Sequence, residues 1–342
     1  MSEIVLGIGT SHSPLLAIDP HEWAERGRDD MRRQAYCMVD GRTLTYDALA
    51  AEVREVHADQ ATLATFTEQA ALAQASLDRI ADELALAAPD IVVVIGDDQD
   101  ELFGSSHRPA FAIFTGASVA MHPKNLVSPE LPAWYRKANI GYSMDRTHVH
   151  DGAPELAQHL VEQLIAGGVD VSVATEVEDA ARAGFGHAFG FIYERLAAGR
   201  RLAMLPVMLN TYFPPNVPTP ARCYEVGHKI GAALRSAPGD LRIAVIASGG
   251  LTHFHTDEAF DRHVLKALRE GDRDTLRTLP VRALRSGNSE ILNWVMAAGA
   301  LEELRVAFER YIPVRRTAAG TGVGLGFLIW KPAHDPDQGE QS

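Results

Sequence analysis

The sequence predicts an α/β fold: a central, mostly parallel or mixed sheet with helices on both faces and an active-site cleft at the carboxyl ends of the strands. Short runs rich in β-branched residues alternate with longer helical patterns, which is typical of such sheets. Several of the short runs are apolar at every position, as strands buried on both faces are. Three of them stop directly on ionisable residues, which places polar groups at one edge of the sheet.

The elements follow one another along the whole chain. The predicted strands are Ile4–Ile8, Ile91–Ile95, Ala110–Phe114, Val169–Ala174, Ala203–Leu209, Ile243–Ala247 and Val323–Trp330. The predicted helices are Gln60–Ala87, Pro154–Ala166, Ala221–Ser236, Glu258–Arg269, Ser289–Ala298 and Leu301–Arg310. The sequence contains no internal repeat, so we expect one fold unit rather than an array of repeated units.

The length suits one large α/β unit, because 342 residues with 46% hydrophobic side chains can bury a sizeable core. We expect a single catalytic domain over residues 1–332. The polar and charged stretch at about 20–80 is expected to form a lid-like insert over the sheet. Residues 333–342 are polar and are expected to fray.

Charge and cysteine content exclude several classes of protein. A net charge of −13 and a pI near 5.5 argue against binding to nucleic acid or to anionic membranes. Cys37 and Cys223 are too few for a disulfide framework or a cysteine-based zinc site. The first residues are expected to form a strand rather than a signal peptide, and no run is long enough to span a membrane. We therefore expect a cytoplasmic protein.

The first polar loop carries His12, which lies between two serines and is followed by Pro14. One interpretation is a helix N-cap made by Ser11 or Ser13, with the histidine merely exposed. The other is an imidazole that ligates a metal and is oriented by short polar neighbours. The loop alone leaves both open.

The second polar loop holds four carboxylates, which follow the apolar run Ile91–Ile95 within a few residues: Asp97, Asp98, Asp100 and Glu101. A solvated acidic turn is one explanation. Acidic groups at the end of a buried strand repel one another unless a cation lies nearby, so participation in a metal site is the other.

The third polar loop, SGGLTHFH at 248–255, contains two glycines that let the backbone approach another group closely. His253 and His255 follow, and strand alternation predicts that they point the same way. They are either core histidines with satisfied hydrogen bonds or site residues.

Three further motifs carry less weight on their own. His187 lies in a glycine-flanked aromatic turn, GFGHAFGF. His148 and His150 form an H-x-H pair, but a surface loop explains them better. The GTGVGLG run at 320–326 precedes a strand instead of opening a helix after one, so it is not a dinucleotide-binding motif.

Taken together, five motifs in order resemble those of the class III extradiol ring-cleavage dioxygenases, over about residues 4–332. The segment GIGTSHSPLL is similar to the family's first metal-histidine loop, and VVVIGDDQ with the later RPAFAI is similar to its second metal loop. GHA resembles its D-H-G turn, and SGGLTH resembles its base motif. SGNSEILNW with the later GAL resembles the helix that carries its metal glutamate.

The resemblance implies roles for individual residues. His12 would be a metal ligand and Glu290 the carboxylate ligand. His253 would be the acid/base histidine beside substrate and O2, and His187 a second active-site histidine that helps to hold the substrate. Without the resemblance, Glu290 would be interpreted as an exposed acid at a helix N-terminus.

Two positions depart from the family's pattern. Its second histidine ligand falls on Gln99, and the aspartate before its second active-site histidine is Gly186. Gln99 would ligate through its amide oxygen, or Asp98 or Glu101 would take its place, or the chain is a relative that no longer binds metal. Similarity to a methylgallate-type subgroup favours an active enzyme with Gln99.

The implied reaction is extradiol cleavage of a catechol-type ring, such as a gallate or protocatechuate derivative, by O2 at a non-haem Fe(II). A facial set of two histidines and one carboxylate leaves positions open for substrate and O2. The diol must lose protons, and a histidine such as His253 suits that task. Tyr212 and Arg222 are candidates for binding the substrate. We expect a homo-oligomer, possibly a dimer, from the habit of the family.

Two other classes compete with this hypothesis. A non-catalytic binding or scaffold relative on the same fold would bind no metal and take up no O2. A metal-dependent hydrolase would use the same pocket without consuming O2. Binding of a nicotinamide cofactor is disfavoured by the missing strand–glycine–helix context.

Overall fold

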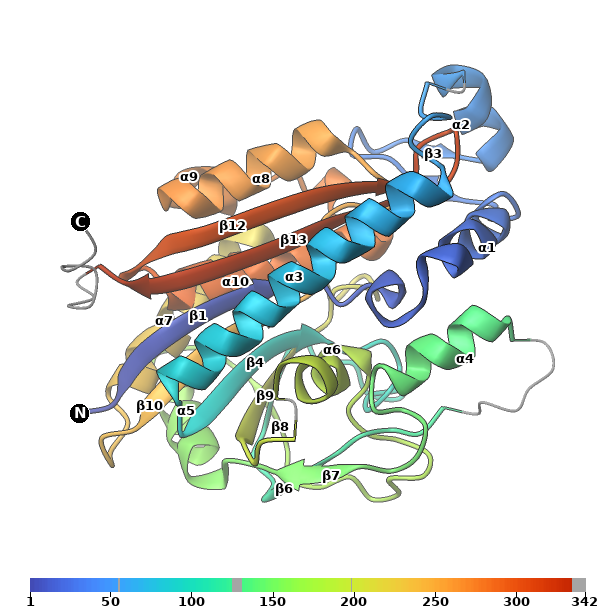
Figure 1. Ribbon diagram of the computed structural model, residues 1–342. Helices are drawn as coiled ribbons and strands as arrows, with labels where there is room; N and C mark the ends of the chain where they lie inside the picture. The colour runs from blue at the N-terminus through green and yellow to red at the C-terminus, as the bar shows by residue number, and fades with distance from the viewer. Residues whose placement is uncertain (55, 125–130, 198, 334–342) are drawn as a thin grey trace, which may run out of the picture.

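The computed structural model describes residues 1–54, 56–124, 131–197 and 199–333. Within them, one nine-stranded sheet has the order β11-β13-β1-β10-β4-β9-β5-β8, with β12 paired to β13 (Figure 1). This confirms the predicted α/β class and mixed sheet. The strands are β1 (Glu3–Thr10), β4 (Ile91–Asp97), β5 (Phe111–Phe114), β8 (Ser172–Ala174), β9 (Ala203–Leu209), β10 (Arg242–Ser248), β11 (His253–His255), β12 (Leu304–Arg315) and β13 (Thr321–Pro332).

The centre of the sheet is parallel. β1 pairs with β10, β10 with β4, and β4 with β9, all in the same direction. β13 runs antiparallel to β1, and β5 runs antiparallel to β9. The carboxyl ends of β1, β10 and β4 therefore meet at one edge, where Thr10 is paired with Ser248. This places the three polar loops of the sequence side by side.

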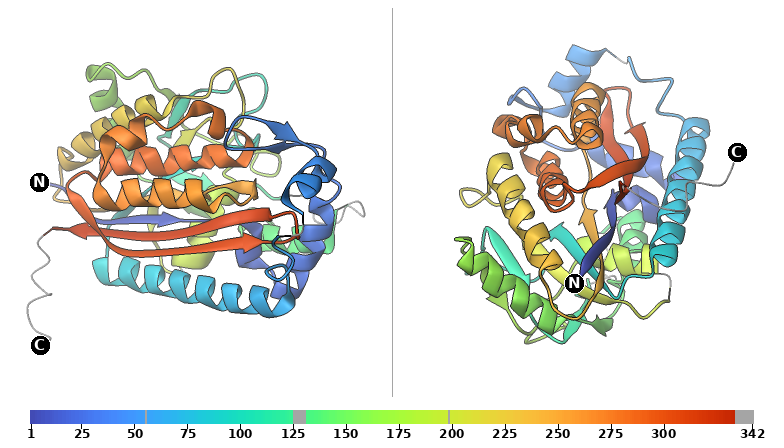
Figure 2. Two further views of the ribbon diagram at one scale, coloured as in Figure 1. Left: turned by 90° about the horizontal axis from the view of Figure 1, so that it is seen from above. Right: turned by 90° about the vertical axis from the view of Figure 1, so that its left-hand side faces the viewer.

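Helices cover both faces of the sheet because successive strand residues point to opposite sides. Val93 and Ile95 of β4 belong to one hydrophobic core, whereas Val92 and Val94 belong to another. Figure 2 shows α3 on one side of the strands and the helices from α7 to α10 on the other. The first core packs under α5 (Pro154–Ala166), α7 (Pro220–Arg235), α8 (Glu258–Glu270), α9 (Arg273–Arg277) and α10 (Ile291–Ala300). The second packs under α1 (Pro20–Asp30), α3 (Leu63–Ala87), α4 (Ala133–Ile140) and α6 (His187–Phe191).

One predicted element is wrong: the helix expected over Leu301–Arg310 is the strand β12. β12 pairs with β13 from Leu304 to Arg315. Leu304 and Val306, two residues apart, pack against the same core, which is the period of a strand, and the pairing becomes irregular between Val306 and Phe308. In the sequence, the helix-forming residues LEELR favour a helix more strongly than this period favours a strand. The segment is nevertheless a strand, because it pairs with the distant strand β13.

The stretch at about 20–80 contains two different kinds of structure. β2 (Tyr36–Cys37), β3 (Thr43–Leu44) and α2 (Tyr46–Val53) share a small core around Tyr36, Met38, Leu49 and Ala319, beyond one end of α3 in Figure 1. In contrast, α3 buries six of its side chains and packs along the sheet. The lid-like role of the insert stays a prediction. The tail at 334–342 lies outside the described residues.

The remaining elements are short. They are the 3₁₀ helices η1 (Pro14–Ala17), η3 (Val281–Ala283) and η4 (Ser286–Glu290), the π-helical turn η2 (Ile192–Ala197) and the small sheet of β6 (Ser118–Ala120) with β7 (Val149–Asp151). Among the described residues, the model contains no helix that is both long and apolar enough to pass through a bilayer.

Candidate active site

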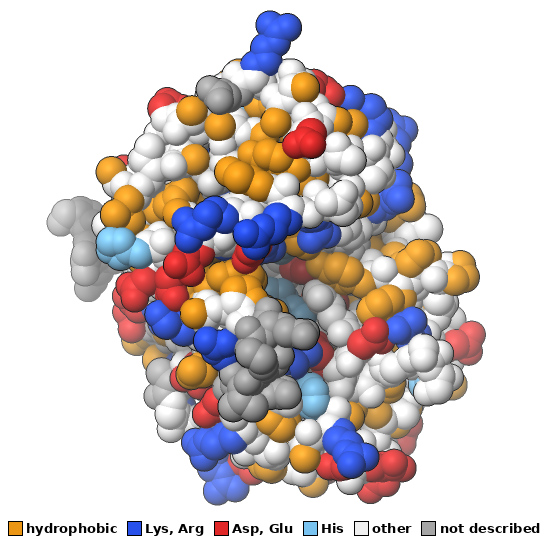
Figure 3. All heavy atoms as spheres, turned by 90° about the vertical axis from the view of Figure 1, so that its right-hand side faces the viewer, with side chains coloured by type: hydrophobic (Ala, Val, Ile, Leu, Met, Phe, Trp, Pro, Cys, Tyr) orange, Lys and Arg blue, Asp and Glu red, His pale blue; other side chains and the backbone are white. Residues whose placement is uncertain are grey.

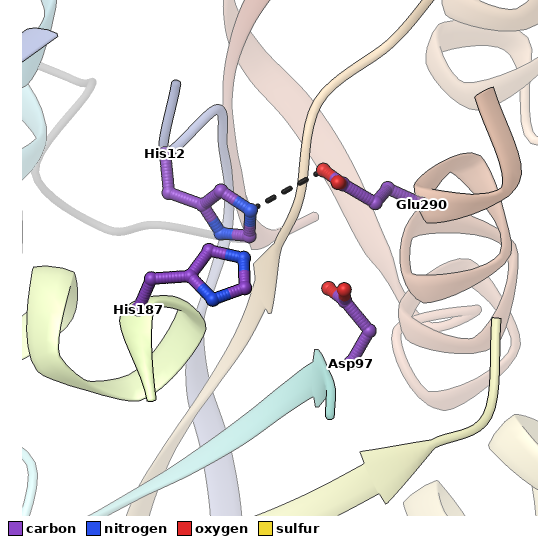
Figure 4. A group of neighbouring side chains, drawn as sticks. All are labelled: His12, Asp97, His187 and Glu290. Atoms are coloured by element: carbon purple, nitrogen blue, oxygen red, sulfur yellow. Dashed lines mark ion pairs between the residues drawn. The ribbon is translucent and has the colours of Figure 1, made fainter. Parts of the chain in front are cut away.

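Four side chains converge at the carboxyl edge of the sheet: His12, Asp97, His187 and Glu290 (Figure 4). One nitrogen or oxygen atom from each lies within 4.8 Å of the corresponding atom of every other. His12 follows β1, Asp97 ends β4, His187 opens α6, and Glu290 lies just before α10. His12, Asp97 and Glu290 are buried, so the expectations of an exposed His12 and an exposed helix-terminal Glu290 are both excluded.

The hydrogen bonds of His12 fix which ring nitrogen faces Glu290. The Ser248 hydroxyl donates to the carbonyl of Ala188 at 2.6 Å, so its oxygen must accept from Nδ1 of His12, 3.0 Å away. In a neutral imidazole, Nε2 is then an acceptor. This Nε2 lies 3.2 Å from Oε2 of Glu290 and has no hydrogen-bond partner among the described residues. With a neutral imidazole, two acceptors therefore face each other, an arrangement that a proton or a metal cation between them would stabilise.

Two buried carboxylates share this small space. Burial raises the pKa of Asp97, and the nearby Glu290 raises it further. Burial also raises the pKa of Glu290, but His253, His12 and the N–H of Gly250 outweigh it and hold that pKa far below its usual value. Like charges at this distance cannot both ionise without a counter-ion. Two imidazoles with carboxylate oxygens form a donor set that first-row transition metals accept, so the residues fit a metal.

Gln99 lies beside this group and lines the same cavity. Its Nε2 donates to Oδ2 of Asp97 at 2.8 Å and lies 3.3 Å from Nε2 of His187. Besides Glu290, a second carboxylate of this group therefore comes from Asp97, which the sequence analysis named among the acids of this loop but did not choose to replace Gln99. Strand alternation was the signal for it, because Asp97 continues the face of Val93 and Ile95 toward α10, where Asn293 donates to it at 3.2 Å.

The other two acids considered for the position of Gln99 point elsewhere. The Asp98 carboxylate accepts from the backbone N–H groups of Leu102 and Phe103 at 2.7 and 3.1 Å. Burial is the main reason why the pKa of Asp98 rises to about 7. Glu101 instead accepts from Nδ1 of His187 at 2.9 Å.

The ion pair of Glu101 and His187 orients the second active-site histidine. Burial lowers the pKa of His187, but Glu101 outweighs this and raises it to about 9. Burial raises the pKa of Glu101, and His187 outweighs this and lowers it to about 2. A Cβ added at Gly186 would lie 1.8 Å from Cδ of Glu101. The Glu101 carboxylate thus occupies the space that an aspartate at 186 would need, which explains the glycine.

His253 points into the same cavity from β11. Its Nδ1 donates to the carbonyl of Leu251 at 2.8 Å, which leaves Nε2 facing Oε2 of Glu290 at 3.5 Å. Gly250 and Gly287 make room for the ring, since a Cβ at either position would lie about 2 Å from its atoms. His255 does not line the cavity, contrary to the alternation expected for this strand. Phe254 has a positive φ of 65°, which breaks the alternation.

The two predicted substrate-binding residues lie in different places. Tyr212 lines the cavity and donates from its hydroxyl to Oε1 of Glu290 at 3.0 Å. Arg222 lies on α7, pairs with Glu225 at 3.1 Å, and is not among the residues that line the cavity. The structure therefore groups His12, His187, His253, Glu290, Gln99 and Tyr212, but not Arg222.

The cavity has a volume of about 300 Å³, which is at the lower end of the usual range for small-molecule pockets. Figure 3 shows this face of the molecule, with histidine visible in a hollow bordered by basic side chains. Besides the group above, Arg26, Lys124, Asn139, Tyr142 and Arg316 line it. The sequence analysis did not identify these residues, because no local motif marks them.

Comparison with known proteins identifies relatives of this chain. Residues 63–325 match the family model described as the catalytic LigB subunit of aromatic ring-opening dioxygenase. A gallate dioxygenase of Pseudomonas putida is 32% identical over 96 residues. That stretch covers 25% of this chain and 28% of the length of the relative.

Proposed function

This chain belongs to the LigB family of catalytic subunits of aromatic ring-opening dioxygenases, and on that premise we propose that it cleaves a catechol-type ring by extradiol insertion of O2 at a non-haem Fe(II). The substrate we propose is a gallate or protocatechuate derivative, in keeping with the similarity to a gallate dioxygenase. The observation that carries the proposal is the buried 3.2 Å contact between Nε2 of His12 and Oε2 of Glu290, which a cation between the two atoms would stabilise.

His12 and Glu290 would hold the iron, with Asp97 or His187 completing the set. Gln99 would then act by orienting Asp97 through its 2.8 Å hydrogen bond, unless its amide turns to offer its oxygen. Bound Fe(II) would supply a site where diol and O2 meet and exchange electron density, which triplet O2 and a closed-shell ring cannot do directly.

His253 would act as the general base for the diol. Its Nδ1 proton is committed to Leu251, so Nε2 is the atom that can accept a proton from a substrate hydroxyl. Nε2 can afterwards return that proton. An imidazole suits both steps because its usual pKa is about 6.5.

His187 and Tyr212 would position the ring. Nδ1 of His187 is held by Glu101, which directs Nε2 toward the metal-binding group. The Tyr212 hydroxyl is held by Glu290. Burial and the nearby Glu290 raise the pKa of Tyr212 well above its usual value, so this group acts as a hydrogen-bond donor rather than as a base.

The test is anaerobic purification, loading with Fe(II), metal analysis, and O2 uptake with gallate, methylgallate and protocatechuate. We expect one iron per chain, diol-dependent O2 uptake and a new ring-fission chromophore whose mass equals substrate plus O2. Loading with Zn(II) is the control and should give no uptake. If the protein retains no iron and takes up no O2, the proposal is contradicted.

We also propose that the protein is cytoplasmic and that it forms a homo-oligomer.

A further inference from the structure

Two arginines from distant parts of the chain line the cavity and share one carboxylate. Arg26 lies on α1, and Arg316 lies between β12 and β13. Nη1 of Arg26 donates to Oδ1 of Asp30 at 2.8 Å, and Nε of Arg316 donates to Oδ2 at 2.8 Å. Thr321 also donates to Oδ2, at 3.0 Å. Both oxygens of this fully buried carboxylate are therefore occupied.

The charges at this end of the cavity do not balance. Two guanidinium groups share the Asp30 carboxylate, and Arg33 and Asp29 also act on Arg26, so three cations face two carboxylates. Burial lowers the pKa of Arg26 to about 10, and Arg316 contributes to the shift by repulsion. Arg26 remains charged near neutral pH, and an anion in the cavity would offset the cost of burying this charge.

Several hydrogen-bond donors at this end are also unused. Among the described residues, Nε and Nη2 of Arg26 and Nη1 of Arg316 have no hydrogen-bond partner. Nδ2 of Asn139, which is 3% exposed and lines the same cavity, is a buried donor without a partner in that part of the chain. Of these donors only the Asn139 amide is fully buried, and a buried donor without an acceptor is costly, so Asn139 points to an acceptor that comes from a ligand.

A planar anion fits these donors best. Guanidinium groups bind carboxylates through two parallel N–H···O bonds, because the planar, forked N–H groups of the guanidinium match the two coplanar oxygens of the carboxylate. The cavity volume of about 300 Å³ suits a single substituted ring. Tyr135, Tyr142 and Phe254 are among the residues that line it.

We propose that Arg26 and Arg316, with Asn139, bind the carboxylate of the gallate- or protocatechuate-type substrate and thereby determine the specificity for it. This proposal rests on the proposed function and adds the residues that select the substrate. Asp30 is a positioning residue, because it holds both guanidinium groups and does not itself line the cavity. Lys124 is a separate cation of the cavity and lies 3.7 Å from Glu101.

Two ligand pairs that differ only in charge test the proposal. Benzoate and benzamide cannot be cleaved, and their binding to the full chain can be measured by calorimetry without O2. Gallate and pyrogallol share the same hydroxyl groups, and their kcat/KM values can be compared on the iron-loaded protein. We expect the wild type to prefer the charged member of each pair by about 10- to 100-fold, the range for hydrogen bonds to a charged group.

Arg26→Gln should lower both preferences about tenfold, because it weakens the charged member of each pair more than the uncharged one, whereas Arg26→Lys should retain part of the preference. Arg316→Gln is a second variant, and circular dichroism checks that each variant folds. The matched control is Arg28→Gln, two residues along the same helix, where the side chain is 62% exposed.

Equal binding of benzoate and benzamide by the wild type would overturn the proposal. So would a preference that Lys124→Gln removes and Arg26→Gln does not. Failure of the proposed function gives a different result: neither gallate nor pyrogallol would support O2 uptake, while the preference for benzoate would persist.

Discussion

The two ends of the cavity are lined by groups of opposite charge. At the end formed by the strand loops, an imidazole acceptor and two carboxylates lie close together, an arrangement that a cation would stabilise. At the end formed by α1 and the β12–β13 connection, two guanidinium groups share one carboxylate, an arrangement that an anion would stabilise. A diol with a carboxylate across the ring would satisfy both ends at once if a metal is bound. The charges of the side chains that line a site therefore indicate the charges of its ligand.

The metal end is tested most directly by removing one ligand. We expect His12→Ala and Glu290→Ala each to reduce iron content from one per chain to almost none, because the cation loses an essential donor. Metal analysis after gel filtration measures this. The exposed pair of His228 and Glu302, 2.9 Å apart, provides matched controls. Full iron content in His12→Ala or Glu290→Ala would remove that residue from the ligand set.

His253 separates metal binding from proton transfer at the same end. We expect His253→Ala to retain iron and to lower turnover by about 100- to 10,000-fold, the usual contribution of a general base. Steady-state O2 uptake measures the loss. His255→Ala, two residues further and outside the cavity, should have a small effect. Turnover near the wild-type rate in His253→Ala would refute its role as the base.

Asp30 tests the arginine end through stability. Asp30→Asn keeps the shape of the side chain but leaves two buried guanidinium groups without their counter-ion. We expect the free energy of unfolding to fall by about 3–5 kcal/mol, as measured by urea denaturation. Asp29→Asn, at a neighbouring and partly exposed position, should cost much less. A loss below about 1 kcal/mol for Asp30→Asn would mean that the arginines do not depend on this carboxylate.

Gly186 gives the smallest expected effect and tests how His187 is held. Gly186→Ala should displace the Glu101 carboxylate, which orients His187. We expect iron affinity or turnover to fall about 10- to 100-fold, the usual effect of losing a residue that orients a metal-site histidine by a hydrogen bond. Gly104→Ala is the control, because a Cβ there would meet no atom within 4 Å. The double variant Gly186→Asp with Glu101→Ala should recover part of the loss. No recovery would show that a carboxylate at 186 cannot replace Glu101.

The sequence by itself determined the fold class and much of the metal end. Short apolar runs placed the strands, and three of these runs stopped at the edge where the site lies. His12, His187, His253 and Glu290 could be identified because each lies in a short local motif. Such motifs can be recognised in the sequence because they consist of residues that are adjacent along the chain.

Only the tertiary structure decided the remainder. It brought Arg316 to Asp30 across 286 positions, and Glu101 to His187 across 86. It also assigned the carboxylate beside the histidines to Asp97 and turned residues 304–315 into a strand. These outcomes depend on which distant groups become neighbours when the chain folds. A local pattern carries no information about that, because pairing energies between distant residues exist only in the folded state.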